Sequence, residues 1–86
     1  MNDPNYTTIP TDMLFSLLLY SQRYAYGRQS YAPGQIIEWI RAYAPLLTSA
    51  NRRVLRESIY GDVERFGRAP YRDKWIALAG ELERDA

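Results

Sequence analysis

The residues best suited to bind a ligand lie in the stretch from Arg23 to Tyr31. It holds two guanidinium groups, three phenols, one side-chain amide and one hydroxyl in nine residues, and no acidic residue occurs between Met13 and Ile37. A guanidinium binds phosphate or carboxylate oxygens through paired hydrogen bonds, and a tyrosine ring offers a flat face for stacking. We therefore expect a site for a phosphorylated, nucleotide-like ligand. Its predicted residues are Arg23, Tyr26, Arg28, Gln29, Ser30 and Tyr31.

The position of this stretch between two expected helices supports the same chemistry. Gly27 suits the left-handed conformation that ends a helix, and Ser30 suits the cap of the next one. The unpaired backbone N–H groups at the start of that next helix attract anions. A purely structural interpretation stays open, because Arg23 stabilises the helix dipole, tyrosines often edge a core and Gln29-Ser30 is common turn chemistry.

Trp39 and three arginines form a second, weaker candidate surface, which would bind a partner protein. Arg52 and Arg56 are four residues apart, so they share one face of a helix, with Arg53 beside them. Arginines suit an acidic partner surface, and a tryptophan often anchors an interface. A solvated amphipathic helix explains the same arginines.

Composition argues against an enzyme and against a cofactor or metal. The chain has no cysteine and no histidine, which removes thiol nucleophiles, Ser-His-Asp chemistry and the commonest metal ligands. Asp62, Glu64 and Asp73 lie among arginines at positions that we expect to be exposed, not paired in a cleft as acid–base catalysis requires. Neither a P-loop nor a nucleophile elbow is found.

The charge balance and the apolar runs bear on partners and location. A net charge of +1 lacks the basic excess of a general nucleic-acid binder. The longest apolar run is too short for a membrane span of about 20 residues. The N-terminus has no basic region typical of a secretory signal. We expect a cytoplasmic protein with no membrane contact.

The spacing of apolar residues predicts one all-α domain, a small bundle of about four helices. Residues 1–9 are expected to form a flexible N-terminal arm, and residues 10–86 the helical domain. The first helix is expected from Pro10–Asp12 to Gly27, capped by Thr8 or Thr11, and the second from Ser30–Gly34 to Ala44. The third is expected over Ala50–Phe66, capped by Thr48 or Ser49, and the last after a capping Asp73. No internal repeat is evident.

Each expected helix has an apolar stripe that predicts its buried face. The predicted core residues are Leu14, Leu17, Leu18, Ser21, Ala25, Ile36, Ile37, Ile40, Tyr43 or Ala44, Val54, Leu55, Ile59, Val63, Phe66, Trp75, Ile76, Ala79 and Leu82. Phe15, Leu19 and Tyr20 are expected to widen the stripe of the first helix, and Trp39 to lie beside that of the second.

The stretch from Arg23 to Tyr31 resembles the Arg-Tyr-Ala-x-Gly-Arg-x-(Ser/Thr)-Tyr pattern of small helical accessory proteins encoded by phages and prophages. The likeness continues more loosely through Ile36–Ile40, Leu55–Ile59 and Asp73-Lys74-Trp75. A cysteine-containing stretch found in some relatives is missing at residues 67–70.

The resemblance implies a counter-defence protein acting in an infected bacterial host. We expect a non-enzymatic, homo-oligomeric protein that sequesters a phosphorylated nucleotide-like signal. The alternative is an anti-CRISPR-like inhibitor that docks on a host defence complex.

Overall fold

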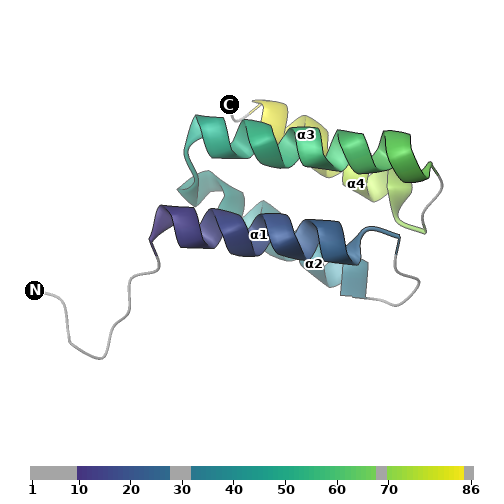
Figure 1. Cartoon of the computed structure of the whole chain (residues 1–86), viewed down its shortest axis with the longest axis horizontal. Coiled ribbons are helices and arrows are strands. Elements are labelled where there is room, and N and C mark those ends of the chain that lie inside the picture. The colour runs from purple at the N-terminus through teal and green to yellow at the C-terminus, as the bar shows by residue number, and fades with distance from the viewer. Residues whose placement is uncertain (1–9, 28–31, 68–69, 85–86) are drawn as a thin grey trace, which may run out of the picture.

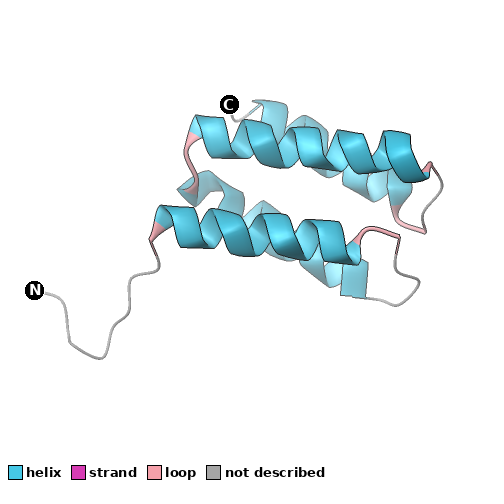
Figure 2. Cartoon of the chain, viewed as in Figure 1, coloured by secondary structure: helices cyan, strands magenta, loops and turns pink. Residues whose placement is uncertain are grey.

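The computed structural model describes residues 10–27, 32–67 and 70–84, and these segments are almost entirely helical. The elements are α1 (Thr11–Ala25), α2 (Ala32–Tyr43), a short 3-10 helix η1 (Ala44–Leu46), α3 (Ser49–Phe66) and α4 (Arg72–Arg84). No strand occurs in these segments (Figure 2). The prediction of a small all-α fold is confirmed.

The four long helices form two hairpins that lie side by side. α1 packs on α2 and α3 packs on α4, and the two hairpins meet through contacts of α1 with α3 and of α2 with α4. Figure 1 shows α1 and α3 in one layer, running in the same direction, with α2 and α4 in the layer behind them. The C-terminal ends of α1 and α3 therefore lie at the same end of the molecule (Figure 1).

Glycines and one threonine set the helix ends much as the sequence predicts. Gly27 and Gly67 follow α1 and α3 with φ angles of 88° and 66°, in the region where a Cβ atom is strained. The Thr48 hydroxyl accepts a 3.1 Å hydrogen bond from the Asn51 backbone N–H and caps α3. Gly61 does not interrupt this helix, which runs unbroken to Phe66.

Three predicted boundaries are wrong in detail. Pro10 occupies the N-cap of α1 without a side-chain hydrogen bond, and Thr11 is already helical; Thr8 lies outside the described residues. Asp73 does not cap α4, because the helix begins one residue earlier. There its carboxylate complements the helix dipole instead. Before Pro45, the backbone tightens from α2 into η1 at Ala44 instead of stopping.

The core lies between the two layers and takes apolar residues from all four helices. Its buried members include Leu18, Ile37, Ile40, Leu55, Ile59, Trp75 and Leu78. Burying one such side chain stabilises the fold by about 1.5–3 kcal/mol. Four residues predicted to be buried are exposed, because the buried arc of each helix is narrower than its apolar pattern. They are Leu17, Tyr20, Val54 and Phe66. Leu78 was not predicted and is fully buried.

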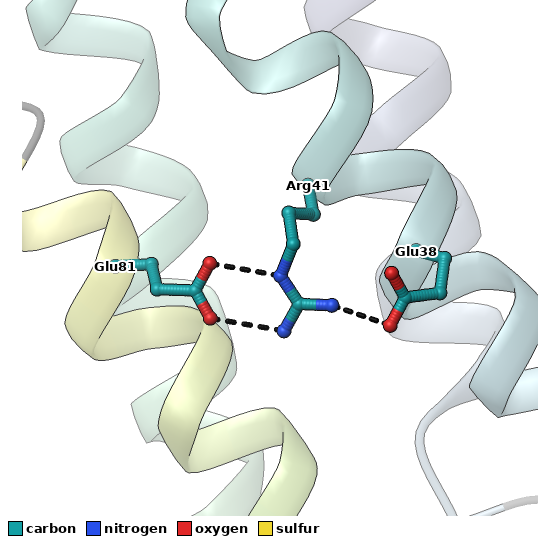
Figure 3. Close-up of polar contacts among 3 residues, drawn as sticks. All are labelled: Glu38, Arg41 and Glu81. Carbon is teal, nitrogen blue, oxygen red and sulfur yellow. Dashed lines mark hydrogen bonds and ion pairs between the residues drawn. The ribbon is translucent and has the colours of Figure 1, made fainter.

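An ion-pair cluster joins the second helices of the two hairpins. The Arg41 guanidinium donates from Nε to Glu81 Oε1 at 2.8 Å and from a terminal nitrogen to Oε2 at 2.9 Å, and it also binds Glu38 (Figure 3). Hydrogen bonding to Glu81 is the largest of the effects that raise the pKa of Arg41. The same bond lowers the pKa of Glu81. This two-point contact fixes how α2 and α4 lie against each other.

No helix in the described part of the chain is long and apolar enough to cross a membrane.

Candidate functional site

A candidate site that contains the predicted ligand residue Arg23 is a groove between the C-terminal halves of α1 and α3. One hollow in this groove, which we call the main hollow, has a volume of about 410 Å³. Two further hollows, of about 330 and 440 Å³, adjoin it, and both share Arg23 with the first. We call this surface the α1–α3 groove. The residues that line its main hollow are Tyr20, Arg23, Tyr24, Asp62, Arg65 and Phe66.

Two arginines line the groove, one from each helix. Arg23 comes from the last turn of α1 and Arg65 from the last turn of α3. Both side chains are exposed. Within the described segments, neither forms an ion pair with a carboxylate. Both guanidiniums are therefore available to an anionic ligand.

Aromatic rings surround these arginines. Tyr20 and Tyr24 are 75% and 59% exposed, and Phe66 is 61% exposed. The Arg65 guanidinium carbon lies 5.8 Å from the centroid of the Phe66 ring, within the range of a cation–π contact. The groove thus combines positive charge with flat apolar surfaces, the two features that a phosphorylated aromatic ligand requires.

A buried polar contact forms the base of the groove. The Gln22 amide Nε2 donates to Asp62 Oδ2 at 2.9 Å, and the Ser58 hydroxyl donates to Gln22 Oε1 at 2.6 Å. Gln22 is fully buried, and Asp62 is only 5% exposed. The expectation that Asp62 is exposed is therefore wrong. The hydrogen-bond donor of this carboxylate is Gln22 on α1. The sequence around Asp62 on α3 therefore does not indicate that the carboxylate is buried.

Tyr26 has a structural position that conflicts with its predicted stacking role. The side chain is 8% exposed and packs against Trp75, at 5.9 Å between ring centroids, and against Phe66, at 6.4 Å. Its hydroxyl donates a long 3.4 Å hydrogen bond to the Gly67 carbonyl. Burial raises the pKa of the phenol. Tyr26 therefore joins the ends of the two hairpins. It borders one of the adjoining hollows, but little of its side chain is exposed there.

Four other predicted ligand residues lie outside the described part of the chain. They are Arg28, Gln29, Ser30 and Tyr31. Their proposed roles in binding stay predictions. Of the two predicted residues that the structure describes, Tyr26 is nearly buried and Arg23 lines the groove with an exposed side chain.

The second candidate surface is dispersed. Arg52 donates to the Leu47 carbonyl at 2.6 Å and to the Ser49 hydroxyl at 3.3 Å, so it closes the start of its own helix. Trp39 is partly buried and meets Tyr43 edge to face, at 6.0 Å between centroids. Arg56 lies 3.8 Å from the neighbouring Glu57, and Arg53 is exposed. Trp39 thus comes from α2 and the three arginines from α3.

The sequence contains a short repeat, contrary to the expectation that none occurs, and its second copy marks the end of α3, the second wall of the groove. Tyr26-Gly27-Arg28-Gln29-Ser30-Tyr31 is matched forty positions later by Phe66-Gly67-Arg68-Ala69-Pro70-Tyr71, and both fit aromatic-Gly-Arg-x-x-Tyr.

The spacing of this repeat matches contacts between the two hairpins. Two contacts between the hairpins, Gln22 with Asp62 and Arg41 with Glu81, also join residues forty positions apart. Equivalent positions therefore face each other across the two hairpins, as in proteins built from stacked helical repeats.

The described residues contain no group of three or more acidic, histidine or cysteine side chains that could hold a metal ion. Comparisons with protein-family models, with curated proteins and with solved structures found no match for this chain.

Proposed function

We propose that this chain is a non-enzymatic binding protein that holds a phosphorylated, ring-bearing ligand in the α1–α3 groove. The observation that carries the proposal is the convergence of Arg23 and Arg65, which have no carboxylate partner within the described segments, on a hollow edged by exposed aromatic rings. The arginines neutralise the phosphate, and the rings of Tyr20, Tyr24 and Phe66 stack on the base.

The biological role that we propose is counter-defence by sequestration of a nucleotide signal. It rests on the resemblance of the stretch from Arg23 to Tyr31 to phage accessory proteins. A sequestering protein needs affinity and no chemistry, which agrees with a chain lacking histidine and cysteine. Of the two tyrosines first expected to stack on the base, Tyr26 is nearly buried and Tyr31 lies outside the described residues. We therefore assign stacking in the groove to Tyr24 together with Tyr20 and Phe66.

Replacing the groove arginines tests the proposal directly. A charge-assisted hydrogen bond contributes about 1.5–3 kcal/mol, so Arg23→Ala and Arg65→Ala should each weaken nucleotide binding by about tenfold or more. Titration calorimetry with nucleoside monophosphates and diphosphates measures the dissociation constants.

Arg53→Ala is the matched control for these variants. Arg53 is an exposed arginine on α3 that does not line the groove, so its loss should leave the affinity unchanged. Unaltered affinity in both groove variants would move the site elsewhere. Failure of every nucleotide to bind more tightly than about 100 μM would end the sequestration role.

The alternative role, an inhibitor docking on a host defence complex through Trp39 and the arginines of α3, is less well supported. Arg52 is engaged in local hydrogen bonds and Trp39 is partly covered. Co-purification of a host protein that is lost on Arg56→Glu, but not on Arg23→Ala, would favour it.

A further inference from the structure

Asp62 is a nearly buried carboxylate that opens onto the groove. It lines both the main hollow and an adjoining one, although only 5% of the residue is exposed. Within the described segments, its one hydrogen-bond donor is the Gln22 amide, which binds Oδ2. Neither Arg23 nor Arg65 lies within ion-pair distance of it, although both line the same hollow.

The neighbouring hydrogen bonds all point toward this carboxylate. The Ser58 hydroxyl donates to the Gln22 amide oxygen, and the Gln22 amide nitrogen donates to Asp62. An ionised carboxylate has room for about four donors and offers none itself. Asp62 Oδ1 is not among the enclosed side-chain atoms that lack a partner, so this second oxygen is accessible from the groove that Asp62 lines. A ligand that brings N–H donors to the base of the groove can therefore bind it.

We infer, on the basis of the proposed function, that the ligand carries a guanine base and that Asp62 selects it. The Watson–Crick edge of guanine presents two adjacent donors, the ring N1–H and the amino group on C2. Adenine places an acceptor nitrogen beside its amino group, and uracil flanks its single N–H with two carbonyl oxygens. Those acceptors repel a carboxylate, so only guanine matches it with neighbouring donors.

The other groove residues suit the rest of such a ligand. With its donor edge on Asp62, the purine ring lies among Tyr20, Tyr24 and Phe66, which line the same hollow. Arg23 and Arg65 then meet the phosphate. The carboxylate thus recognises the base, while the arginines supply affinity for any phosphorylated ligand.

Four nucleotides distinguish this inference from the proposed function. Dissociation constants are measured by titration calorimetry for 5′-GMP, 5′-IMP, 5′-AMP and 5′-UMP. We expect 5′-GMP to bind most tightly. 5′-IMP, which lacks the amino group on C2, should bind about tenfold more weakly, and 5′-AMP and 5′-UMP more weakly still. Equal binding of all four overturns the guanine inference and leaves the proposed function standing. Binding of none overturns the proposed function as well.

An Asp62→Asn variant tests the carboxylate itself. Asparagine keeps the size and can still accept from Gln22, but it replaces the second acceptor with a donor. The preference for 5′-GMP over 5′-AMP should disappear. Glu64→Gln, the same chemical change at an exposed acid two residues away, should keep it. An undiminished preference in Asp62→Asn overturns the inference. If circular dichroism shows that this variant does not fold, the unmodified protein supplies the test instead. Equal affinity for 5′-IMP and 5′-GMP would then overturn the guanine inference, and weaker binding of 5′-IMP would support it.

Discussion

The burial of Tyr26 makes the stability of the fold depend on pH. Burial raises the pKa of its phenol above the ordinary value of 10.0. The folded state therefore holds this proton more tightly than the unfolded state, so stability is complete below pH 10 and falls as pH rises through the folded pKa. Tyr26→Phe removes this titration. We expect the variant to lose less stability than the unmodified protein in urea unfolding above pH 10.

At pH 7, the stability of Tyr26→Phe should differ little from that of the unmodified protein. The hydrogen bond that it removes is long, at 3.4 Å, so its loss should change the free energy of unfolding by less than about 1 kcal/mol. A large loss at pH 7, or identical losses above pH 10 in both proteins, would contradict this interpretation of Tyr26.

Individual site residues were predictable only where their own segment determines them. Arg23 follows from the density of arginine and tyrosine near the end of α1. Asp62 and Arg65 could not be identified that way, because their role depends on α1 lying beside α3. Tyr26 was assigned to the ligand since its type suits stacking, but an aromatic residue at a helix end can equally fill the core. Only packing decides between the two.

At the scale of the elements, the link between α2 and α4 gives a second pH-dependent prediction. Hydrogen bonding to Arg41 lowers the pKa of Glu81. The stabilisation is therefore complete above the unfolded pKa and is lost as pH falls through the folded value. Both side chains are about one-third exposed. Glu81→Gln should thus cost only about 0.5–1 kcal/mol at pH 7, as partly solvated ion pairs do.

Glu38→Gln is the control for this pair. Glu38 is more exposed and contacts Arg41 within the same helix, so its loss should cost about 0.2–0.5 kcal/mol. Thermal unfolding at pH 7 and at pH 3 measures both effects. The difference between Glu81→Gln and the unmodified protein should shrink at the lower pH, and a difference that persists there would exclude the ion pair as its source.

The helices themselves were largely predictable, and their partners were not. Apolar spacing, Gly27 and Thr48 indicate where helices run and end, because these signals act within a few residues. Which helices pack together depends on contacts across forty positions, such as Gln22 with Asp62. The repeated aromatic-Gly-Arg-x-x-Tyr motif is the one sequence feature that indicates such pairing, since stacked repeats bring equivalent positions together.

At the scale of the whole molecule, α1 has an outward face that is unusually apolar. Met13, Leu17, Tyr20 and Tyr24 recur at the spacing of a helix–helix seam and are between 45% and 75% exposed. In stacked helical repeats, the outer face of a terminal unit is normally polar. The acidic residue of α1, Asp12, lies in its first turn, and the basic residue, Arg23, lies in its last turn. Two copies paired antiparallel through this face would therefore bring Asp12 of each toward Arg23 of the other. Because Tyr20, Arg23 and Tyr24 also line the groove, this pairing would compete with ligand binding.

We accordingly expect the protein to form a dimer through α1, one that dissociates on dilution. A stable interface buries about 800 Å² on each partner, more than a stripe on one helix provides, so association should be weak. Leu17→Glu should shift the protein to monomer without touching the groove lining, while Leu46→Glu, an equivalent change at an exposed leucine of η1, should not. Sedimentation velocity over a range of concentrations measures the association, which should also weaken with salt if Asp12 and Arg23 pair between copies. A monomer at every concentration, or a dimer unchanged by Leu17→Glu, would show that this face of α1 does not bind a second copy.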